Sequence, residues 1–313
     1  MTRIAVAARS FSRNAALRSE LAAKYADVTF SESPAILEGA ALVELLRGHD
    51  RAIIGLERID DEVLAQVPEL RIISKYGVGL DGLDLEAIAR HGVRLAWTGG
   101  VNRRSVAELT LAFAIALLHR VPETSVALRA GVFQKLVGRQ LTGRVVGIIG
   151  CGFVGKDLVS LLAPFGCRVL AHDIRDYPEF YAATGVEPVG LDRLLAEAEI
   201  VTLHVPLDPS THGMIGAAQL ARMRQGAFLI NAARGGLVDE AALAAALSSG
   251  HLAGAACDVF EQEPEASAAL LALPTFLGTP HIGGSTAEAQ LAMGRAAIAG
   301  LEQARAVADG WPL

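Results

Sequence analysis

Three short segments in the C-terminal part of the chain each carry one ionisable side chain that could bind an anion or transfer a proton. Asn231-Ala-Ala-Arg234-Gly follows an apolar run typical of a buried strand, and an arginine there could hold a carboxylate through two parallel hydrogen bonds. Glu263-Pro lies beyond the next such run, and Thr279-Pro-His281 follows another. Because ligands bind at the carboxyl ends of parallel strands, we predict that Arg234, Glu263 and His281 form one catalytic site.

A glycine-rich turn forms the second candidate site. An apolar run, Val145 to Ile149, leads directly into Gly150-Cys-Gly152-Phe-Val-Gly155, which is the G-x-G-x-x-G pattern of dinucleotide-binding folds. We expect Gly150 to allow a tight turn and Gly152 to let the backbone approach a pyrophosphate. Gly155 would let the following helix pack closely on the strand.

An acidic residue at the end of the next strand supports this interpretation. Asp173 lies 18 residues beyond Gly155, close to the spacing of about 20 that is typical of a ribose-binding carboxylate. The N–H groups of Phe153 and Val154 would face the phosphate charge from the helix N-terminus. A carboxylate at Asp173 repels a 2′-phosphate, so the sequence predicts NAD as the cofactor, whereas the nearby Arg175 leaves binding of NADP open.

The segments that must position these residues alternate between short strand-like runs and longer helical patterns, which is typical of parallel α/β sheets. We therefore predict an α/β fold with two Rossmann-like parallel-sheet domains. The first comprises residues 1–100 and 285–313, and the second, residues 101–284, is inserted in it. The last helix, Thr286 to Val307, is expected to cross back onto the first domain without a strand after it.

The composition excludes several classes of protein. The 313 residues suffice for two domains, and 28 Lys and Arg against 34 Asp and Glu leave no basic stripe for a nucleic acid. The three cysteines lack C-x-x-C spacing, so we expect neither disulfides nor a metal site. The apolar run Leu111 to Leu118 is far shorter than the ~20 residues that span a bilayer. Since the N-terminus also lacks a secretory signal, we expect a cytoplasmic protein without a membrane partner.

Taken together, these motifs resemble those of the D-2-hydroxyacid dehydrogenase family, which includes phosphoglycerate dehydrogenases and glyoxylate and hydroxypyruvate reductases. The resemblance extends over nearly the whole chain. It includes Lys75-Tyr-Gly-Val-Gly79-Leu-Asp81, Asn102-Arg-Arg-Ser-Val-Ala-Glu108 and Leu203-His-Val-Pro-Leu207. The resemblance implies that the discontinuous domain binds the substrate, that the inserted domain binds NAD, and that a hydride passes between nicotinamide and C2 of a D-2-hydroxy or 2-oxo acid.

The resemblance also implies roles for the single residues. His281 would donate a proton to the developing alkoxide, and Glu263 would orient the imidazole from its other nitrogen. Arg234 would bind the substrate carboxylate and polarise the carbonyl group. Ala232 and Asp258 would lie along the cofactor.

The substrate is less well defined by the sequence. In the family, a segment matching Gly77 to Gly79 presents backbone N–H groups to the substrate carboxylate, which places Val78 and Gly79 at the substrate. Lys75 occupies a position that is often basic in the phosphoglycerate dehydrogenase branch, and Arg103 and Arg104 add further cations. We therefore expect a 3-phosphoglycerate-like substrate. The alternative is that these charged residues are solvated at the surface and do not bind the substrate.

Two alternatives remain open. A glyoxylate or hydroxypyruvate reductase would need only Arg234 and the glycine segment for its small substrates. A protein of another class, an NAD-sensing binding protein similar to the co-repressors of this fold, would keep the nucleotide site without turnover. The family further implies a homodimer, for which the apolar helix Ser105 to His119 and the following Val121-Pro-Glu123 are the candidate interface. The chain ends at Leu313, so we expect no C-terminal regulatory domain.

Overall fold

The computed structural model describes residues 2–307 and divides into two compact units. Unit 1 comprises Met1–Asn102 and Gly284–Leu313, and unit 2 comprises Arg103–Gly283. Each unit contains one sheet, of six strands in unit 1 and seven in unit 2, and the α/β fold with two parallel-sheet domains is confirmed. The tail 308–313, which the sequence analysis included in the substrate domain, lies outside the described residues.

Unit 1 has the strand order β13-β5-β4-β3-β1-β2. The five strands β1 to β5 are parallel, and their order is that of the flavodoxin-like doubly wound fold. The strands are β1 (Arg3–Val6), β2 (Asp27–Phe30), β3 (Arg51–Ile54), β4 (Ile72–Lys75), β5 (Arg94–Ala96) and β13 (Arg305–Ala306). The helices are α1 (Arg9–Ser12), α2 (Ala15–Ala22), α3 (Gly39–Leu46), α4 (Asp61–Ala65), α5 (Leu85–Arg90) and α14 (Ala287–Gln303).

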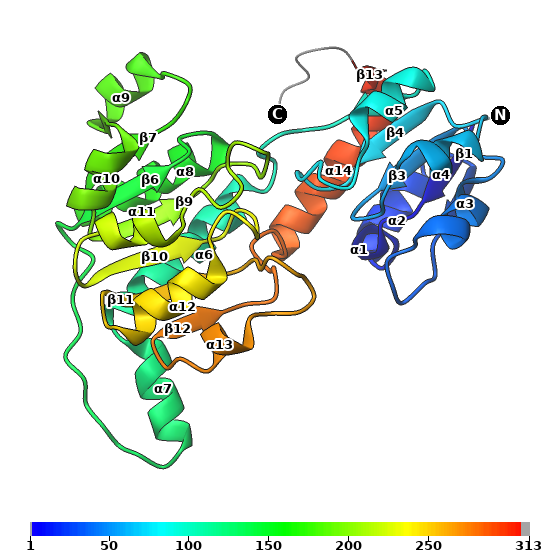
Figure 1. Ribbon diagram of the computed structural model, residues 1–313. Helices are drawn as coiled ribbons and strands as arrows, with labels where there is room; N and C mark the ends of the chain where they lie inside the picture. The colour runs from blue at the N-terminus through cyan, green and yellow to red at the C-terminus, as the bar shows by residue number, and fades with distance from the viewer. Residues whose placement is uncertain (1, 308–313) are drawn as a thin grey trace. The chain divides into compact units, whose positions relative to one another are not determined.

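The C-terminal helix α14 belongs to unit 1, as expected. Two glycines let it approach the core closely, because an added Cβ would lie 2.2 Å from Leu17 Cδ1 at Gly294 and 2.3 Å from Ser74 Oγ at Gly300. Figure 1 shows α14 as the orange helix beside β4. The expectation that no strand follows this helix is wrong. The helix ends at Gln303, and β13 then pairs antiparallel with β5, which covers the edge of the sheet.

Unit 2 has the strand order β12-β11-β10-β9-β6-β7-β8, all parallel, which is the Rossmann arrangement (Figure 1). Its strands are β6 (Val145–Ile149), β7 (Arg168–His172), β8 (Glu187–Pro188), β9 (Ile200–Leu203), β10 (Ala227–Asn231), β11 (Leu252–Cys257) and β12 (Phe276–Gly278). Its helices are α6 (Arg103–Leu118), α7 (Val121–Arg129), α8 (Phe153–Leu162), the 3-10 turn η1 (Ala163–Phe165), α9 (Pro178–Thr184), α10 (Leu191–Glu197), α11 (Ala217–Arg222), α12 (Glu240–Ser248) and α13 (Ala268–Leu271).

The helix α6, which the sequence analysis proposed as part of an interface, contributes mainly to the core of unit 2. Half of its residues are buried, and it packs against α8. Exposed apolar side chains lie instead on α7 and the segment after it. These residues are Val121, Val126, Leu128, Val132, Phe133 and Val137. Among residues 2–307, no single helix is long and apolar enough to cross a membrane, although the bent pair α6 and α7 satisfies that criterion jointly.

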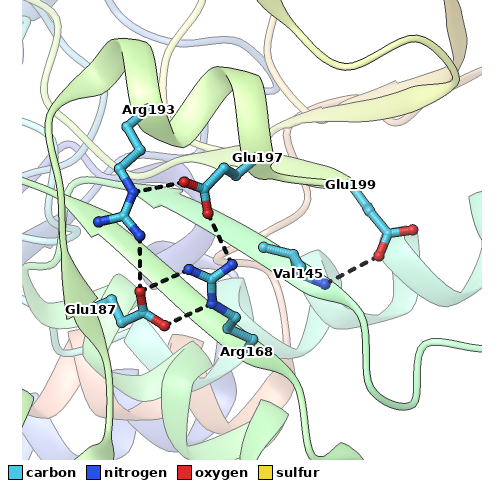
Figure 2. A network of polar contacts seen from close by, with 6 residues as sticks. All are labelled: Val145, Arg168, Glu187, Arg193, Glu197 and Glu199. Carbon is cyan, nitrogen blue, oxygen red and sulfur yellow. Dashed lines mark hydrogen bonds and ion pairs between the residues drawn. The ribbon is translucent and has the colours of Figure 1, made fainter.

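A network of ion pairs connects β7, β8 and α10 at the β8 edge of this sheet (Figure 2). Arg168 on β7 forms two hydrogen bonds with Glu187 on β8, at 2.7 and 2.8 Å, and a third with Glu197 on α10 at 2.9 Å. Arg193 on α10 contacts the same two carboxylates. The network therefore holds the two-residue strand β8 and the helix α10 against the strand that precedes Asp173.

Candidate active site

The glycine turn in unit 2 has the geometry that the sequence analysis predicted. Gly150 has a φ of +94°, and an added Cβ would lie 2.5 Å from the carbonyl oxygen of His204. An added Cβ on Gly155 would lie 2.3 Å from Gly150 O, so a larger residue would push the helix away from the turn. At Gly152, in contrast, no heavy atom lies within 4 Å of an added Cβ. The turn is therefore crowded on its protein side and open where a pyrophosphate would approach.

The helix that follows the turn has an N-terminus of the kind expected for an anion site. Gly152 is the N-cap of α8, and no side chain caps the first N–H groups of this helix, to which Phe153 and Val154 belong. Backbone N–H groups left without partners at a helix N-terminus attract negative charge, as does the helix dipole. The open face at Gly152 and these N–H groups together fit the phosphates of a dinucleotide.

Asp173 lies immediately beside this turn. Its Oδ2 accepts a hydrogen bond from Cys151 N at 2.7 Å, and its Oδ1 accepts one from Arg175 N at 2.8 Å. The carboxylate also lines a pocket of about 320 Å³ at the end of β7, together with Ile174, Tyr181 and other residues of unit 2. The backbone N–H groups of Cys151 and Arg175 therefore orient the Asp173 carboxylate, which could accept hydrogen bonds from the hydroxyls of a ribose.

Arg234 lies on a turn at the end of β10, and two hydrogen bonds from the Asn231 side chain stabilise this turn. The Asn231 side chain donates to Arg234 O at 2.8 Å and accepts from Ala233 N at 3.1 Å. Ala232 is buried inside this turn. The next residue must be glycine, because an added Cβ on Gly235 would lie 1.8 Å from the carbonyl oxygen of Phe260. The turn therefore packs directly on the backbone of the segment that leads to Glu263.

Asp258 anchors the loop that carries the candidate catalytic histidine. It is 1% exposed, and its two carboxylate oxygens accept hydrogen bonds from Ile282 N at 2.8 Å, Gly283 N at 2.7 Å and the Thr279 hydroxyl. Its own N–H donates to Asn231 O at 2.9 Å. Asp258 thus connects the Arg234 turn, through its backbone N–H, to the histidine loop, through its buried carboxylate.

His281 and Glu263 form a direct pair. The distance between His281 Nδ1 and Glu263 Oε2 is 2.8 Å, and the other carboxylate oxygen accepts from Phe260 N at 3.2 Å. The backbone of His281 has a φ of +53°, a left-handed conformation that is uncommon for a residue with a side chain. Its N–H donates to the carbonyl oxygens of Asp258 and Thr279, which holds this conformation.

A second histidine lies beneath the glycine turn. His204 Nε2 is 3.1 Å from Thr202 Oγ1, and Nδ1 has no hydrogen-bond partner among the described residues. Burial lowers the pKa of His204 to about 3, so the ring is neutral at physiological pH. Burial also raises the pKa of the neighbouring Cys151 thiol to about 11. Neither side chain therefore adds a charge to the phosphate site.

The predicted substrate residues Lys75, Val78 and Gly79 lie in unit 1. Val78 and Gly79 are partly exposed on the loop after β4, where the Trp97 indole N–H donates to Val78 O at 2.8 Å. Lys75, in contrast, is only 6% exposed, and its Nζ donates hydrogen bonds to the carbonyl oxygens of Gly55 and Tyr76. Its assignment as a substrate ligand stays a prediction, with buried partners that the sequence analysis did not anticipate.

Unit 2 thus contains most of the predicted site residues, in two groups, whereas Lys75, Val78 and Gly79 lie in unit 1. The glycine turn and Asp173 form the nucleotide group, and Arg234, Asp258, Glu263 and His281 form the acid–base group. Sequence reasoning missed the anchoring role of Asp258 and the contribution of Thr279, whose only signal is its position directly after a strand. Among the described residues, no three His, Cys, Asp or Glu side chains cluster as metal ligands do.

Comparison with known proteins identifies relatives of the whole arrangement. Residues 111–283 match the family model of the D-isomer specific 2-hydroxyacid dehydrogenase, NAD binding domain. A D-3-phosphoglycerate dehydrogenase of Mycobacterium leprae is 40% identical over 234 residues, which cover 74% of this chain and 44% of the relative. The chain therefore spans less than half of the length of that relative.

Two solved structures cover nearly the whole chain. A protein from Thermus thermophilus is 34% identical with a TM-score of 0.82, over 99% of this chain and 97% of the other. The pyruvate reductase of Chlamydomonas reinhardtii is 32% identical with a TM-score of 0.82, over 96% and 95% of the two chains. Both units therefore have counterparts in solved structures.

Proposed function

Since the chain belongs to the D-isomer specific 2-hydroxyacid dehydrogenase family, we propose that it is an NAD-dependent oxidoreductase that interconverts D-2-hydroxy acids and 2-oxo acids. The observation that carries this proposal is the 2.8 Å contact between His281 Nδ1 and Glu263 Oε2. An imidazole oriented by a carboxylate is suited to transfer a proton from its second nitrogen. In unit 2 this pair is connected through Asp258 to the Arg234 turn.

His281, Glu263 and Arg234 each act directly in this reaction. When bound, NADH supplies the hydride that reduces C2 of the 2-oxo acid. His281 Nε2 donates a proton to the oxygen on which negative charge develops, while Glu263 keeps Nδ1 protonated. The guanidinium of Arg234 binds the substrate carboxylate and stabilises the developing charge. In the reverse direction His281 accepts the proton of the hydroxyl group.

The proposed cofactor is NAD rather than NADP. The open face at Gly152 and the N-terminus of α8 fit a pyrophosphate, and the match of residues 111–283 to an NAD-binding domain supports the same group. Asp173 would accept hydrogen bonds from the ribose hydroxyls. Its negative charge disfavours a 2′-phosphate at that position.

For the substrate we propose a 2-oxo acid with a second anionic group, related to 3-phosphoglycerate. The support is the 40% identity to a relative named D-3-phosphoglycerate dehydrogenase. A reductase of small 2-oxo acids without a second anionic group is the second candidate. The burial of Lys75 favours it, because that cation is occupied by backbone oxygens. The 32% identity to a pyruvate reductase that matches the chain over 96% of its length also supports this candidate.

We further propose that the protein is a cytoplasmic homodimer. The three free cysteines are compatible with a reducing compartment. The apolar side chains on α7 and residues 132–137 would be covered by a second copy of the same surface. Phe133 and Val137, which are 82% and 92% exposed, are the clearest examples.

The role of the acid–base pair is tested by Glu263→Gln, with Glu261→Gln as the matched control, because Glu261 is an exposed acid two residues away in the same loop. We expect Glu263→Gln to lower kcat for reduction of a 2-oxo acid by roughly 100-fold or more. NADH binding, measured by fluorescence, should stay unchanged in both variants. Equal turnover by the two variants would contradict the proposal.

A further inference from the structure

Two buried charged side chains in unit 1 lie outside the predicted acid–base group. Lys75 ends β4 and is 6% exposed, and Glu57 lies on the loop after β3 and is 1% exposed. Charged side chains are almost never buried to this degree unless they are paired or hydrogen-bonded. These two therefore require a structural or functional reason.

The backbone of a single residue, Gly55, contacts both charged side chains. Gly55 O accepts a hydrogen bond from Lys75 Nζ, and Gly55 N donates to Glu57 Oε2 at 2.6 Å. Burial raises the pKa of Glu57 above its ordinary value, and hydrogen bonds from the backbone N–H groups of Glu57 and Gly55 and the positive charge of Lys75 offset only part of this rise. Lys75 Nζ also donates to Tyr76 O at 3.3 Å. The pair thus holds the loop after β3 against the first peptide of the segment that contains Gly77 to Gly79.

The same loop also contacts the far end of that glycine segment. An added Cβ on Gly82 would lie 3.1 Å from Glu57 O, and Ile59 N donates to Gly82 O at 2.8 Å. Residues 77–82 are therefore held at both ends by residues 55–59. Between these ends, the bond from Trp97 Nε1 to Val78 O fixes the middle of the segment.

Tyr76, the residue directly before the glycine segment, is held by apolar contacts. Its ring packs against Phe11 in an edge-to-face contact with 5.9 Å between the ring centroids, inside the apolar cluster that includes α14. Two consecutive residues, Lys75 and Tyr76, are thus both buried immediately before Gly77, whose φ is +109°. The direction in which the chain enters the glycine segment is therefore set by buried contacts on both sides.

We propose that the Lys75–Glu57 pair positions the segment Gly77 to Gly79, so that its backbone N–H groups are oriented to receive the carboxylate of the 2-oxo acid. Lys75 acts through this segment and is not itself a ligand of the substrate. The inference rests on the proposed function, because that function makes a carboxylate the ligand of the segment. It assigns Lys75 and Glu57 as positioning residues.

The pair is tested by the single variants Lys75→Met and Glu57→Gln and by the double variant that carries both changes. Each single change removes one contact to Gly55 and leaves the other buried side chain without the opposite charge near it, which displaces the segment. We expect KM for 2-oxo acids to rise about 10-fold or more in each single variant, and the double variant to recover part of this loss. The affinity for NADH, which the other unit would bind, should not change.

Substrate comparison separates positioning from direct binding. If Lys75 positions the segment, the loss is similar for 3-phosphohydroxypyruvate and hydroxypyruvate, and Glu57→Gln has the same effect as Lys75→Met. If Lys75 binds the phosphate directly, only Lys75→Met impairs the enzyme, and only with the phosphorylated acid. The second pattern would overturn the inference while leaving the proposed function intact. A wild-type protein that reduces no 2-oxo acid would refute the proposed function and this inference with it.

A readout independent of activity uses Trp97. The chain has two tryptophans, so Trp311→Phe leaves Trp97 as the only one, and its bond to Val78 O reports the position of the segment. We expect its emission to shift in both single variants, and an unchanged spectrum would contradict a displaced segment. If a single variant fails to fold, Glu57→Asp serves instead, because it keeps the charge but withdraws the carboxylate from Gly55 N.

Discussion

Asp258 is the residue on which the geometry of the candidate acid–base group depends most. Its carboxylate accepts three hydrogen bonds from the loop 279–283, and its N–H reaches the strand end before Arg234. The sequence analysis assigned it only to the cofactor. Its anchoring role could not be predicted, because hydrogen bonds between residues more than 20 positions apart leave no periodic pattern in a sequence.

The neutral His204 predicts a specific dependence of stability on pH. Its pKa is about 3 in the folded protein and 6.5 in an exposed histidine, so below pH 6.5 the unfolded chain takes up a proton that the folded protein does not. Stability should therefore fall as the pH drops from 6.5 towards 3, by about 1.4 kcal/mol per pH unit. Denaturant unfolding at pH 7 and pH 5 measures this loss, which His204→Asn should reduce.

The matched control for this prediction is His119→Asn, which changes an exposed histidine of the same unit. It should leave the pH dependence as it is in the wild-type protein. An equal pH dependence in the wild-type protein and in His204→Asn would show that His204 does not titrate as its burial requires.

At the residue scale the sequence was most informative for glycines and least informative for buried charges. The distinct roles of Gly150, Gly152 and Gly155 follow from a known pattern, and the contacts of an added Cβ agree with each role. Lys75 was expected to bind the substrate because its position is often basic in the phosphoglycerate dehydrogenase branch, with a solvated surface charge as the alternative, and neither expectation includes burial. Its burial is explained by the hydrogen bond from its Nζ to Gly55 O and by the nearby negative charge of Glu57.

At the scale of elements, the short pieces at the edge of the unit 2 sheet were not predicted. The strand β8 has two residues, and one of them is Pro188, so neither alternation nor β-propensity marks it. Its position depends on its parallel pairing with β7 and on the ion pairs among Arg168, Glu187, Arg193 and Glu197 (Figure 2). Such a network joins residues up to 29 positions apart, so it is visible only in the folded chain.

This network gives a prediction for the variant Arg168→Met. Loss of the shared guanidinium should lower the Tm at low ionic strength, and the difference from the wild-type protein should shrink at high salt, because exposed charges are screened. Hydrogen bonds from Arg168 and Arg193 lower the pKa of Glu187 and of Glu197. The stabilisation is therefore present above the ordinary glutamate pKa of 4.5 and is lost as the pH falls through the lowered values.

Thermal unfolding at two salt concentrations checks this prediction. Arg71→Met is the control, because Arg71 is exposed and lies outside the network. A Tm difference for Arg168→Met that is independent of salt would indicate lost packing rather than lost ion pairs.

At the scale of the whole molecule, the α/β class with two parallel-sheet domains could be predicted, because alternating strands and helices restrict the chain to few topologies. The antiparallel strand β13 could not be predicted, since two exposed residues after a long helix carry no hydrophobic pattern. The candidate interface also needed the structure. Half of the residues of the apolar helix α6 are buried, and exposed apolar side chains lie on α7 and on residues 132–137 after it.

The proposed dimer leads to a prediction about mass. The wild-type protein should sediment at twice the mass of one chain, and Phe133→Ser should dissociate at concentrations where the wild-type protein does not, because the variant removes an exposed apolar anchor. Leu271→Ser, at an exposed leucine on α13, is the control and should remain dimeric. Sedimentation of the wild-type protein as a single chain would refute the proposed dimer.

The central claim, that this chain reduces 2-oxo acids with NADH, is tested most directly by NADH oxidation with 3-phosphohydroxypyruvate, hydroxypyruvate and glyoxylate. We predict turnover of at least one of these acids and a loss of roughly 100-fold or more in His281→Ala with NADH binding retained. A preference for the phosphorylated acid would support the 3-phosphoglycerate-like substrate, and turnover of only the small acids would support the reductase. NADH binding without oxidation by any of the three acids would contradict the claim and favour an NAD-sensing protein.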